Sequence, residues 1–209
     1  MGLKERRERE KEARKKQILD AARKLLLKKG IQSTSINQIA RTAELGVGTI
    51  YFYYQSKEEI FYSLQEEGLD ILYRDIKTTD CREIEPDEKL RETGRTYLRF
   101  SAEHKDYFDI INYFLATPSV ILSSGLKRQL DQQGSNILDL IAGFIRSGIS
   151  GGIFRSVDPK KYAVMFWGAL HGLTQFKKLE DTVLEGEDHQ LIFNYAVDQL
   201  IDGLKRTTD

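Results

Sequence analysis

Residues 34–61 read TSINQIARTAELGVGTIYFYYQSKEEIF, and this stretch decides the fold. Ser35 and Gln38 have the spacing of a capping box, which predicts a short helix from there to about Ala43. Residues 44–46 supply a turn, and a second short helix is predicted over residues 47–53. Small or apolar residues stand where the two helices would cross: Ile39, Ala40, Ala43, Leu45, Val47 and Ile50. Two short helices joined by a tight turn and supported by a longer helix form the helix-turn-helix arrangement.

A long helix is predicted before this pair, over residues 4–29, with Gly30 as its C-terminal stop. Its second half has apolar residues at the helical period: Ile18, Ala21, Ala22, Leu25 and Leu26. Its first half, the arm of residues 4–16, has no apolar stripe. We interpret the arm as a solvated helix because its glutamates offset much of its positive charge. A non-specific phosphate contact is the alternative, made by Arg14, Lys15 or Lys16.

The rest of the chain is also predicted to be helical. Ser56 and Glu59 form a second capping box, which opens a long helix over residues 57–77. Helices of bundle length follow over residues 86–103, 106–117, 120–149, 159–179 and 187–206. Strands are not expected, because no stretch alternates apolar and polar residues over a strand's length. We therefore predict an all-α protein of about nine helices, with an N-terminal three-helix helix-turn-helix domain over residues 1–57 and a C-terminal helical domain over residues 58–209.

The net charge of zero hides an asymmetry along the chain. Residues 1–57 contain 14 Lys and Arg against 6 Asp and Glu, whereas residues 58–209 contain 18 against 26. A basic module followed by an acidic one predicts that the first domain meets a polyanion and that the second does something else.

Composition excludes several classes of protein. The 209 residues include no apolar run long enough to cross a membrane, and the start of the chain lacks the apolar segment of a secretory signal. The lone Cys81 fits a reducing compartment, so we expect a cytoplasmic protein. The three histidines lie far apart, so neither a metal site nor a cofactor is expected. No catalytic constellation or phosphate-binding loop occurs, which argues against an enzyme.

The outward side of the two short helices has residues suited to a DNA groove. Thr49 offers a hydroxyl to a base edge and a methyl group to thymine, and Phe52 can contact thymine methyls. Gly48 has no side chain, so the backbone can approach bases or phosphate closely. These residues predict a surface that binds double-stranded DNA.

The same stretch resembles the DNA-binding domain of the tetracycline-repressor (TetR/AcrR) family, whose pattern is roughly T-x-x-x-I-A-x-x-A-G-V-S-x-G-T-L-Y-x-H-F-x-S-K-E-x-L. The matching positions are Ile39, Ala40, Ala43, Gly48, Thr49, Tyr51, Ser56, Lys57 and Glu58. The resemblance covers roughly residues 12–62 and implies a ligand-responsive transcriptional regulator, most often a repressor. It also implies a homodimer on a pseudo-palindromic operator, with recognition helices in major grooves about 34–36 Å apart.

The resemblance assigns DNA-contacting roles to ten residues, of which four would face bases and three would face phosphates. They are Val47, Gly48, Thr49 and Phe52 at bases, Tyr51, Tyr53 and Lys57 at phosphates, and Thr34, Asn37 and Gln38 at either. Three positions depart from the family pattern. Glu44 replaces a turn glycine, which makes a left-handed backbone there less favourable. Gly46 replaces a serine cap and Tyr53 replaces histidine, and these changes leave the operator sequence open.

Aromatic residues are numerous in the second domain, and two interpretations fit them. Aromatic residues at helical spacing fill cores, and for any single residue this is the better interpretation. Taken together, they support a cavity between helices for a small apolar or aromatic effector. The candidates are Tyr97, Phe100, Tyr113, Phe114, Phe144, Trp167 and His171.

The last two predicted helices are apolar around most of their circumference, which is too wide an arc for one buried face. We expect a second copy of the chain to cover the surplus, and a partly exposed apolar surface is the alternative. The candidate dimer contacts are Tyr162, Met165, Phe166, Ala169, Leu173, Tyr195 and Leu200.

A different function remains open at this point. The chain could be a helical DNA-binding or interaction protein that responds to no effector. A filled core, together with a DNA affinity that apolar metabolites do not change, would favour that alternative.

Overall fold

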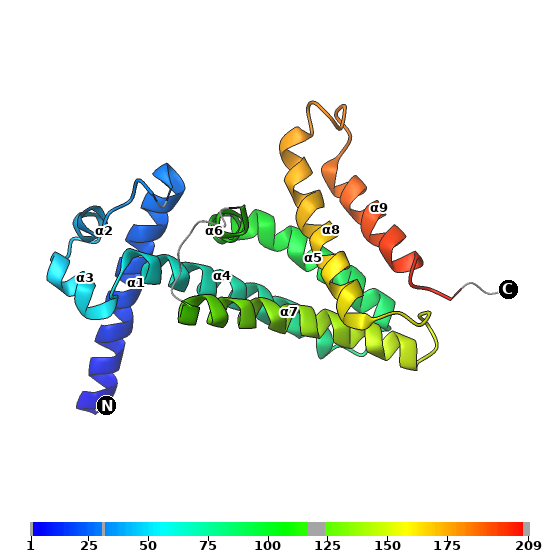
Figure 1. Cartoon of the computed structure of the whole chain (residues 1–209), viewed down its shortest axis with the longest axis horizontal. Coiled ribbons are helices and arrows are strands. Elements are labelled where there is room, and N and C mark those ends of the chain that lie inside the picture. The colour runs from blue at the N-terminus through cyan, green and yellow to red at the C-terminus, as the bar shows by residue number, and fades with distance from the viewer. Residues whose placement is uncertain (1, 31, 117–123, 207–209) are drawn as a thin grey trace. The chain divides into compact units, whose positions relative to one another are not determined.

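The computed structural model describes residues 2–30, 32–116 and 124–206 (Figure 1). In these ranges the chain is helical, and the contact between Phe154 and Lys205 is an isolated bridge. The helices are α1 (Leu3–Lys29), α2 (Ile36–Thr42), α3 (Val47–Tyr53), α4 (Lys57–Asp80), α5 (Pro86–Glu103), α6 (Lys105–Ala116), α7 (Ser124–Ser150), α8 (Pro159–Gln175), the 3-10 turn η1 (Phe176–Leu179) and α9 (His189–Asp202). The all-α prediction with an N-terminal helix-turn-helix is confirmed. No helix in the described ranges is long and apolar enough to cross a membrane.

The chain packs as two compact units. Unit 1 comprises Met1–Leu69 and Lys105–Asp131, and unit 2 comprises Asp70–His104 and Gln132–Asp209. These packing units differ from the division predicted at residue 57, because α4 and α7 each contribute to both units and α6 packs on α1 in unit 1.

The core of unit 1 holds the helix-turn-helix together. The inward face of α1 packs on α2, α3 and the start of α4, and Ile110 of α6 joins the same cluster. Each buried residue of this cluster exposes less than a tenth of its surface. Among them are Ile18, Ala22, Leu26, Ile39, Ala40, Ile50, Ile60, Phe61 and Leu64. Helices of seven residues are not stable alone, so α2 and α3 depend on packing against this core.

The helix ends of unit 1 are capped where the sequence predicts. The Ser35 hydroxyl accepts from the backbone N–H of Gln38, and the Gln38 side chain accepts from the backbone N–H of Ser35 at 3.0 Å. At the start of α4, the Ser56 hydroxyl accepts from the backbone N–H of Glu59 at 3.1 Å. The two caps fix where α2 and α4 begin, on either side of α3 in the sequence.

In unit 2, α5 packs against α8 and α9, which lie side by side (Figure 1). Asp158 caps α8 and Asp188 caps α9 through their side-chain oxygens. Beyond Gln175, α8 gives way to η1, and α9 begins at His189, so both helices are shorter than predicted. The predicted start of the third bundle helix at residue 120 lies outside the described residues, and α7 is described from Ser124.

Candidate nucleic-acid interface

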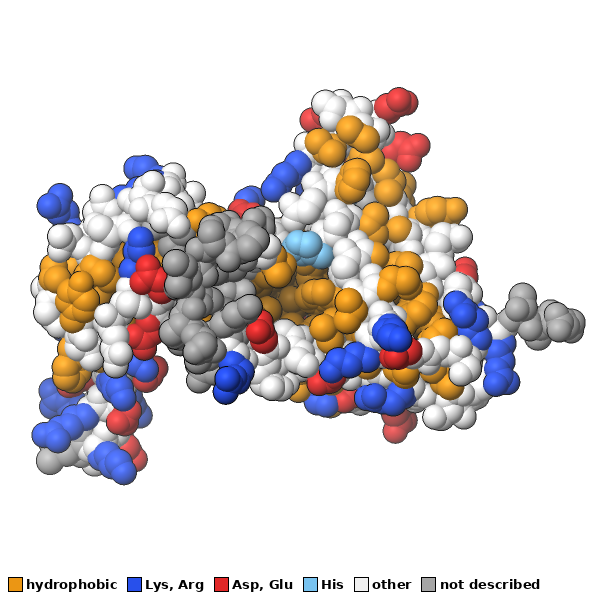
Figure 2. Space-filling model, viewed as in Figure 1, with side chains coloured by type: hydrophobic (Ala, Val, Ile, Leu, Met, Phe, Trp, Pro, Cys, Tyr) orange, Lys and Arg blue, Asp and Glu red, His pale blue; other side chains and the backbone are white. Residues whose placement is uncertain are grey.

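The outward face of α3 is unusually apolar for a surface helix. Phe52 is 79% exposed, Tyr51 is 54% exposed and Val47 is also exposed, whereas Ile50 is fully buried. Figure 2 shows apolar side chains gathered over α3. Because Ile50 fixes the helix to the core, these three side chains are presented on a rigid support rather than on a loop.

The other predicted residues of α3 complete this face. Gly48 is exposed, and no atom lies within 4 Å of the place where a Cβ would stand, so the backbone is open to close approach. Thr49 is half-buried and sits one turn before Tyr53, which packs partly on the core. The Tyr53 ring lies edge-on to Phe52 with the ring centres 5.1 Å apart.

The predicted residues from the second helix do not all reach the surface. Asn37 and Gln38 are exposed on α2, although the Gln38 side chain is engaged in the capping box. Thr34 is only 2% exposed, and its hydroxyl donates to the carbonyl oxygen of Gly30 at 2.8 Å. The structure therefore does not present the Thr34 side chain, and we leave this residue out of the interface proposed below.

Lys57 is the first residue of α4 and is half-buried. Beside it, the first turn of α4 leaves backbone N–H groups at a helix N-terminus, where anions are favoured. Glu58 and Glu59 lie in the same turn, and the Glu59 carboxylate accepts from the backbone N–H of Gln55. This end of α4 is thus suited to holding one phosphate through Lys57 and backbone N–H groups.

The turn between α2 and α3 departs from the family pattern in the way that the sequence predicts. Glu44 has φ 53°, the left-handed conformation that glycine adopts without strain. The Gln17 side chain holds this turn by donating to the carbonyl oxygen of Ala43 at 2.6 Å. This contact of Gln17 was not predicted, because no local spacing connects residues that far apart in sequence.

Replacing Glu44 with glycine should raise the free energy of unfolding by about 1 kcal/mol, because glycine tolerates the left-handed backbone. Arg41→Gly is the matched control in α2, where the backbone is helical, and it should lower that free energy by about 1 kcal/mol. Urea unfolding of the three proteins measures both changes. A loss of stability in Glu44→Gly would contradict the strain assigned to this turn.

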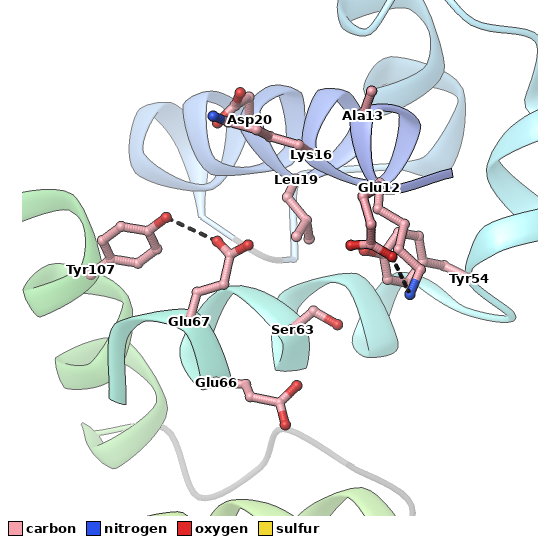
Figure 3. Close-up of a pocket in the computed structure, with 11 residues that line it drawn as sticks. Glu12, Ala13, Lys16, Leu19, Asp20, Tyr54, Ser63, Glu66, Glu67 and Tyr107 are labelled. Carbon is pink, nitrogen blue, oxygen red and sulfur yellow. Dashed lines mark hydrogen bonds and ion pairs between the residues drawn. The ribbon is translucent and has the colours of Figure 1, made fainter. Parts of the chain in front are cut away.

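A pocket of unit 1 lies between α1 and α4, where the sequence predicted no pocket (Figure 3). The Tyr107 hydroxyl donates to the Glu67 carboxylate at 2.9 Å, and the Arg23 guanidinium lies 5.2 Å from the centre of the Tyr107 ring. Burial raises the pKa of Glu67, and burial with the hydrogen bond to Glu67 raises the pKa of Tyr107 to about 12. These contacts connect α1, α4 and α6 behind the helix-turn-helix. The pocket lining has four carboxylates and two lysines, so it is more acidic than basic and does not suit DNA; the carboxylates are those of Glu12, Asp20, Glu66 and Glu67.

Three of the predicted effector residues form a cluster in unit 2. The Tyr97 hydroxyl and Nδ1 of His171 share a hydrogen bond of 2.8 Å, and the Trp167 ring lies 4.8 Å from the Tyr97 ring. Burial lowers the pKa of His171 and raises that of Tyr97, so the imidazole is neutral and the phenol keeps its proton at neutral pH. This gives α5 and α8 a shared aromatic cluster with a polar end.

The remaining candidates for the effector site are placed differently. Phe100 and Phe144 are buried in unit 2, where Lys89 Nζ lies 5.5 Å from the centre of the Phe144 ring. Tyr113 belongs to unit 1, where it packs against the helix-turn-helix core. The side chain of Phe114 lies outside those that the structure describes.

The predicted dimer residues of α8 and α9 separate into exposed and internal ones. Met165 and Tyr195 are exposed, and so are Val164 and Leu191, which the prediction omitted. Phe166 has no exposed surface, so it belongs to the core of its own chain. The half-buried members are Tyr162, whose hydroxyl donates to the Leu200 carbonyl oxygen at 2.5 Å, together with Leu200, Ala169 and Leu173.

Two family profiles match the chain. One, described as bacterial regulatory proteins of the tetR family, matches residues 18–64. The other, described as a tetracyclin repressor-like C-terminal domain, matches residues 90–200. Together they include the helix-turn-helix and most of the C-terminal helices.

Individual proteins agree with these matches. An uncharacterized HTH-type transcriptional regulator, YhgD of Bacillus subtilis (strain 168), is 26% identical over 147 residues, which are 70% of this chain and 75% of the relative. FadR from Bacillus subtilis, solved in complex with stearoyl-CoA, matches with a TM-score of 0.70 and 21% identity over 90% of this chain and 98% of its own. AibR, solved in complex with isovaleryl coenzyme A and operator DNA, matches with a TM-score of 0.72 and 19% identity over the same shares. The two structures have the same fold as this chain.

Proposed function

Because the chain belongs to the TetR family of bacterial regulatory proteins, we propose that this DNA-binding transcriptional regulator is a repressor that binds a pseudo-palindromic operator as a homodimer and is released by a small effector. The observation that carries the proposal is the exposed face of α3. The exposed Phe52 ring is not part of the core, and burying it in a major groove removes apolar surface from water.

The proposed contacts are those that the family resemblance implies, at residues that unit 1 leaves exposed or half-buried. Val47, Gly48, Thr49 and Phe52 face bases, whereas Tyr51, Tyr53 and Lys57 face phosphates, with Asn37 and Gln38 beside them. Base contacts specify a sequence and phosphate contacts position the protein, so the two groups have separable effects.

The homodimer is supported by the exposed apolar residues of α8 and α9. Val164, Met165, Leu191 and Tyr195 lie on two adjacent helices, and the same helices of a second copy would bury them. The two recognition helices then occupy successive major grooves about 34–36 Å apart. The spacing of the operator half-sites is a direct consequence of this interface.

The effector is proposed to be apolar or aromatic and to bind at the cluster of Tyr97, Trp167 and His171. The acyl-CoA complexes of FadR and AibR support an acyl chain as one form of that apolar part. An effector shifts DNA binding only if it prefers the conformation that cannot bind DNA. Since α4 contains Lys57 and also extends into unit 2, its position is the proposed link between effector and DNA.

Selection of duplex DNA from a random library by the purified protein tests the proposal. We expect a two-fold symmetric consensus, and complexes that dissociate when acyl-CoAs or aromatic acids are added. Failure to enrich any sequence at low salt would overturn the regulator proposal. Enrichment with no response to any compound would favour the effector-independent alternative.

Lys57→Ala should weaken binding to the selected duplex and to a scrambled duplex by the same factor, because a phosphate contact carries no sequence information. The slope of log K against log[salt] should fall by about 1 per protomer, the change expected when each protomer no longer binds one phosphate. Lys177 is an exposed lysine of η1, outside unit 1. Lys177→Ala removes the same charge and should leave the affinity and the salt slope unchanged for both duplexes. A Lys57→Ala protein with weaker affinity for the selected duplex alone would contradict the phosphate role.

A further inference from the structure

The first half of α1 forms an arm with no core beneath it. Described side chains from Lys4 to Arg14 are all exposed, and the first buried residue of the helix is Ile18. The family profile also begins at residue 18, so the arm precedes the matched domain. At about 1.5 Å per residue, the helix from Leu3 to Gln17 is roughly 22 Å long. Burial therefore does not explain why this segment is helical and charged.

The basic residues of the arm are ordered on one face. Lys4, Arg7, Lys11 and Arg14 follow one another at intervals of three and four residues, which places them along one side of a helix. The same interval leads from Arg14 to Ile18, which lies in the helix-turn-helix core. The basic stripe, these four residues, thus continues the side of α1 on which the helix-turn-helix packs.

Two of the four glutamates of the arm form ion pairs with basic residues outside the stripe. Arg6 pairs with Glu10 at 2.9 Å, and Lys15 pairs with Glu12 at 3.8 Å, and neither base belongs to the stripe. Arg14 donates to the neutral Gln17 side chain. Within the described part of α1, no ion pair involves Lys4, Arg7 or Lys11. The arm of residues 4–16 has eight Lys and Arg against four Glu, and half of these basic residues lie in the stripe.

The C-terminal end of the arm lies close to the end of the recognition helix. Tyr54, the C-terminal cap of α3, lines the same pocket as Glu12, Lys15 and Lys16 (Figure 3). The part of α1 before Glu12 extends past that end of α3 (Figure 1). Figure 2 shows basic side chains mostly along the edge of the arm below α3, with acidic ones mostly on the other edge.

We propose that the basic stripe binds the phosphate backbone of the duplex next to the base pairs that α3 contacts. This inference rests on the proposed function, because it takes α3 as the groove-binding helix. Duplex DNA presents one negative charge for each ~1.7 Å of its axis, so an arm of this length meets several phosphates. The stripe replaces the interpretation of the arm as a merely solvated helix, and it adds affinity without adding sequence preference.

A pair of triple variants tests the stripe. The first is Lys4→Gln with Arg7→Gln and Lys11→Gln, and the second is the matched control Arg6→Gln with Arg9→Gln and Lys24→Gln, which removes the same charge from other sides of α1. Glutamine keeps a high helix propensity, and circular dichroism checks that helicity is unchanged. Affinity is measured for the duplex selected by the wild-type protein and for a scrambled duplex, from low to physiological salt.

The stripe variant should bind both duplexes about tenfold or more weakly, and its salt slope should fall by about 0.9 for each phosphate that it no longer binds, or about 3 per protomer. The ratio between the two duplexes should stay constant, and the control variant should remain close to wild type. Equal behaviour of the two variants would overturn the stripe while leaving the regulator proposal intact. A wild-type protein that binds neither duplex would instead overturn the regulator proposal.

Discussion

Gly148→Ala is expected to lower the free energy of unfolding by about 3 kcal/mol, the largest effect on stability anticipated for a single methyl group in this protein. A Cβ at Gly148 would stand 2.1 Å from Cδ2 of Phe154 and 2.4 Å from Cε2. No pair of non-bonded carbon atoms tolerates such a distance, so the aromatic ring must leave its site. Phe154 has no exposed surface, and its displacement opens the core of unit 2.

The backbone around Phe154 prevents an easy adjustment. The N–H groups of Ile153 and Phe154 both donate to the Gly148 carbonyl oxygen, at 2.9 and 3.0 Å, and the Arg155 N–H donates to the Leu204 carbonyl oxygen at 2.8 Å. Gly143→Ala is the matched control in the same helix, since no atom lies within 4 Å of its Cβ position. It should be neutral or stabilising by up to about 1 kcal/mol. Thermal and urea unfolding that gave both variants the same stability would refute the packing described here.

Phe52→Ala should lower the affinity for the selected duplex by a factor of about ten to one hundred, which corresponds to ~1–3 kcal/mol. The ring is exposed on α3 and is proposed to contact thymine methyls, so its truncation removes a base contact and not a core contact. The free energy of unfolding should change by less than about 0.5 kcal/mol. Fluorescence anisotropy with the selected and scrambled duplexes measures the affinity, and the decrease should be larger for the selected one.

Leu27→Ala provides the comparison for this variant. Leu27 is another exposed apolar side chain of unit 1, on α1, and it is not among the proposed DNA contacts. Its truncation should leave both affinities unchanged. If Phe52→Ala and Leu27→Ala had the same effect, exposed apolar surface in general, rather than the face of α3, would account for it.

The helix-turn-helix could be predicted from the sequence because its signals are local. Ser35 with Gln38 and Ser56 with Glu59 set helix starts within four residues, and the structure has those caps. The strain at Glu44 could also be predicted, since the left-handed conformation is a property of one residue. The burial of Thr34 was harder to predict, because the side chain is held inward by its hydrogen bond to the Gly30 carbonyl oxygen.

The predicted effector and dimer residues are a mixture of core residues and residues of the proposed sites. An aromatic residue at helical spacing looks the same in sequence whether it fills a core, as Phe100 does, or joins a polar cluster, as Trp167 does. Tyr113 was grouped with them because it falls in the predicted second domain, residues 58–209, yet it packs in unit 1. Phe166 and Met165 are neighbours in sequence, yet Phe166 is buried and Met165 is exposed. Because this helix is apolar around most of its circumference, its sequence does not show which side is buried.

The position of Trp167 has a practical consequence. It is the only tryptophan in the sequence, and its indole lies against the Tyr97 ring, whose hydroxyl bonds to His171. Indole emission responds to local polarity and to nearby quenching groups, so the fluorescence of the intact, unlabelled protein reports on this one location in α8. A compound that enters the cluster changes that emission, and occupancy can be titrated without DNA present.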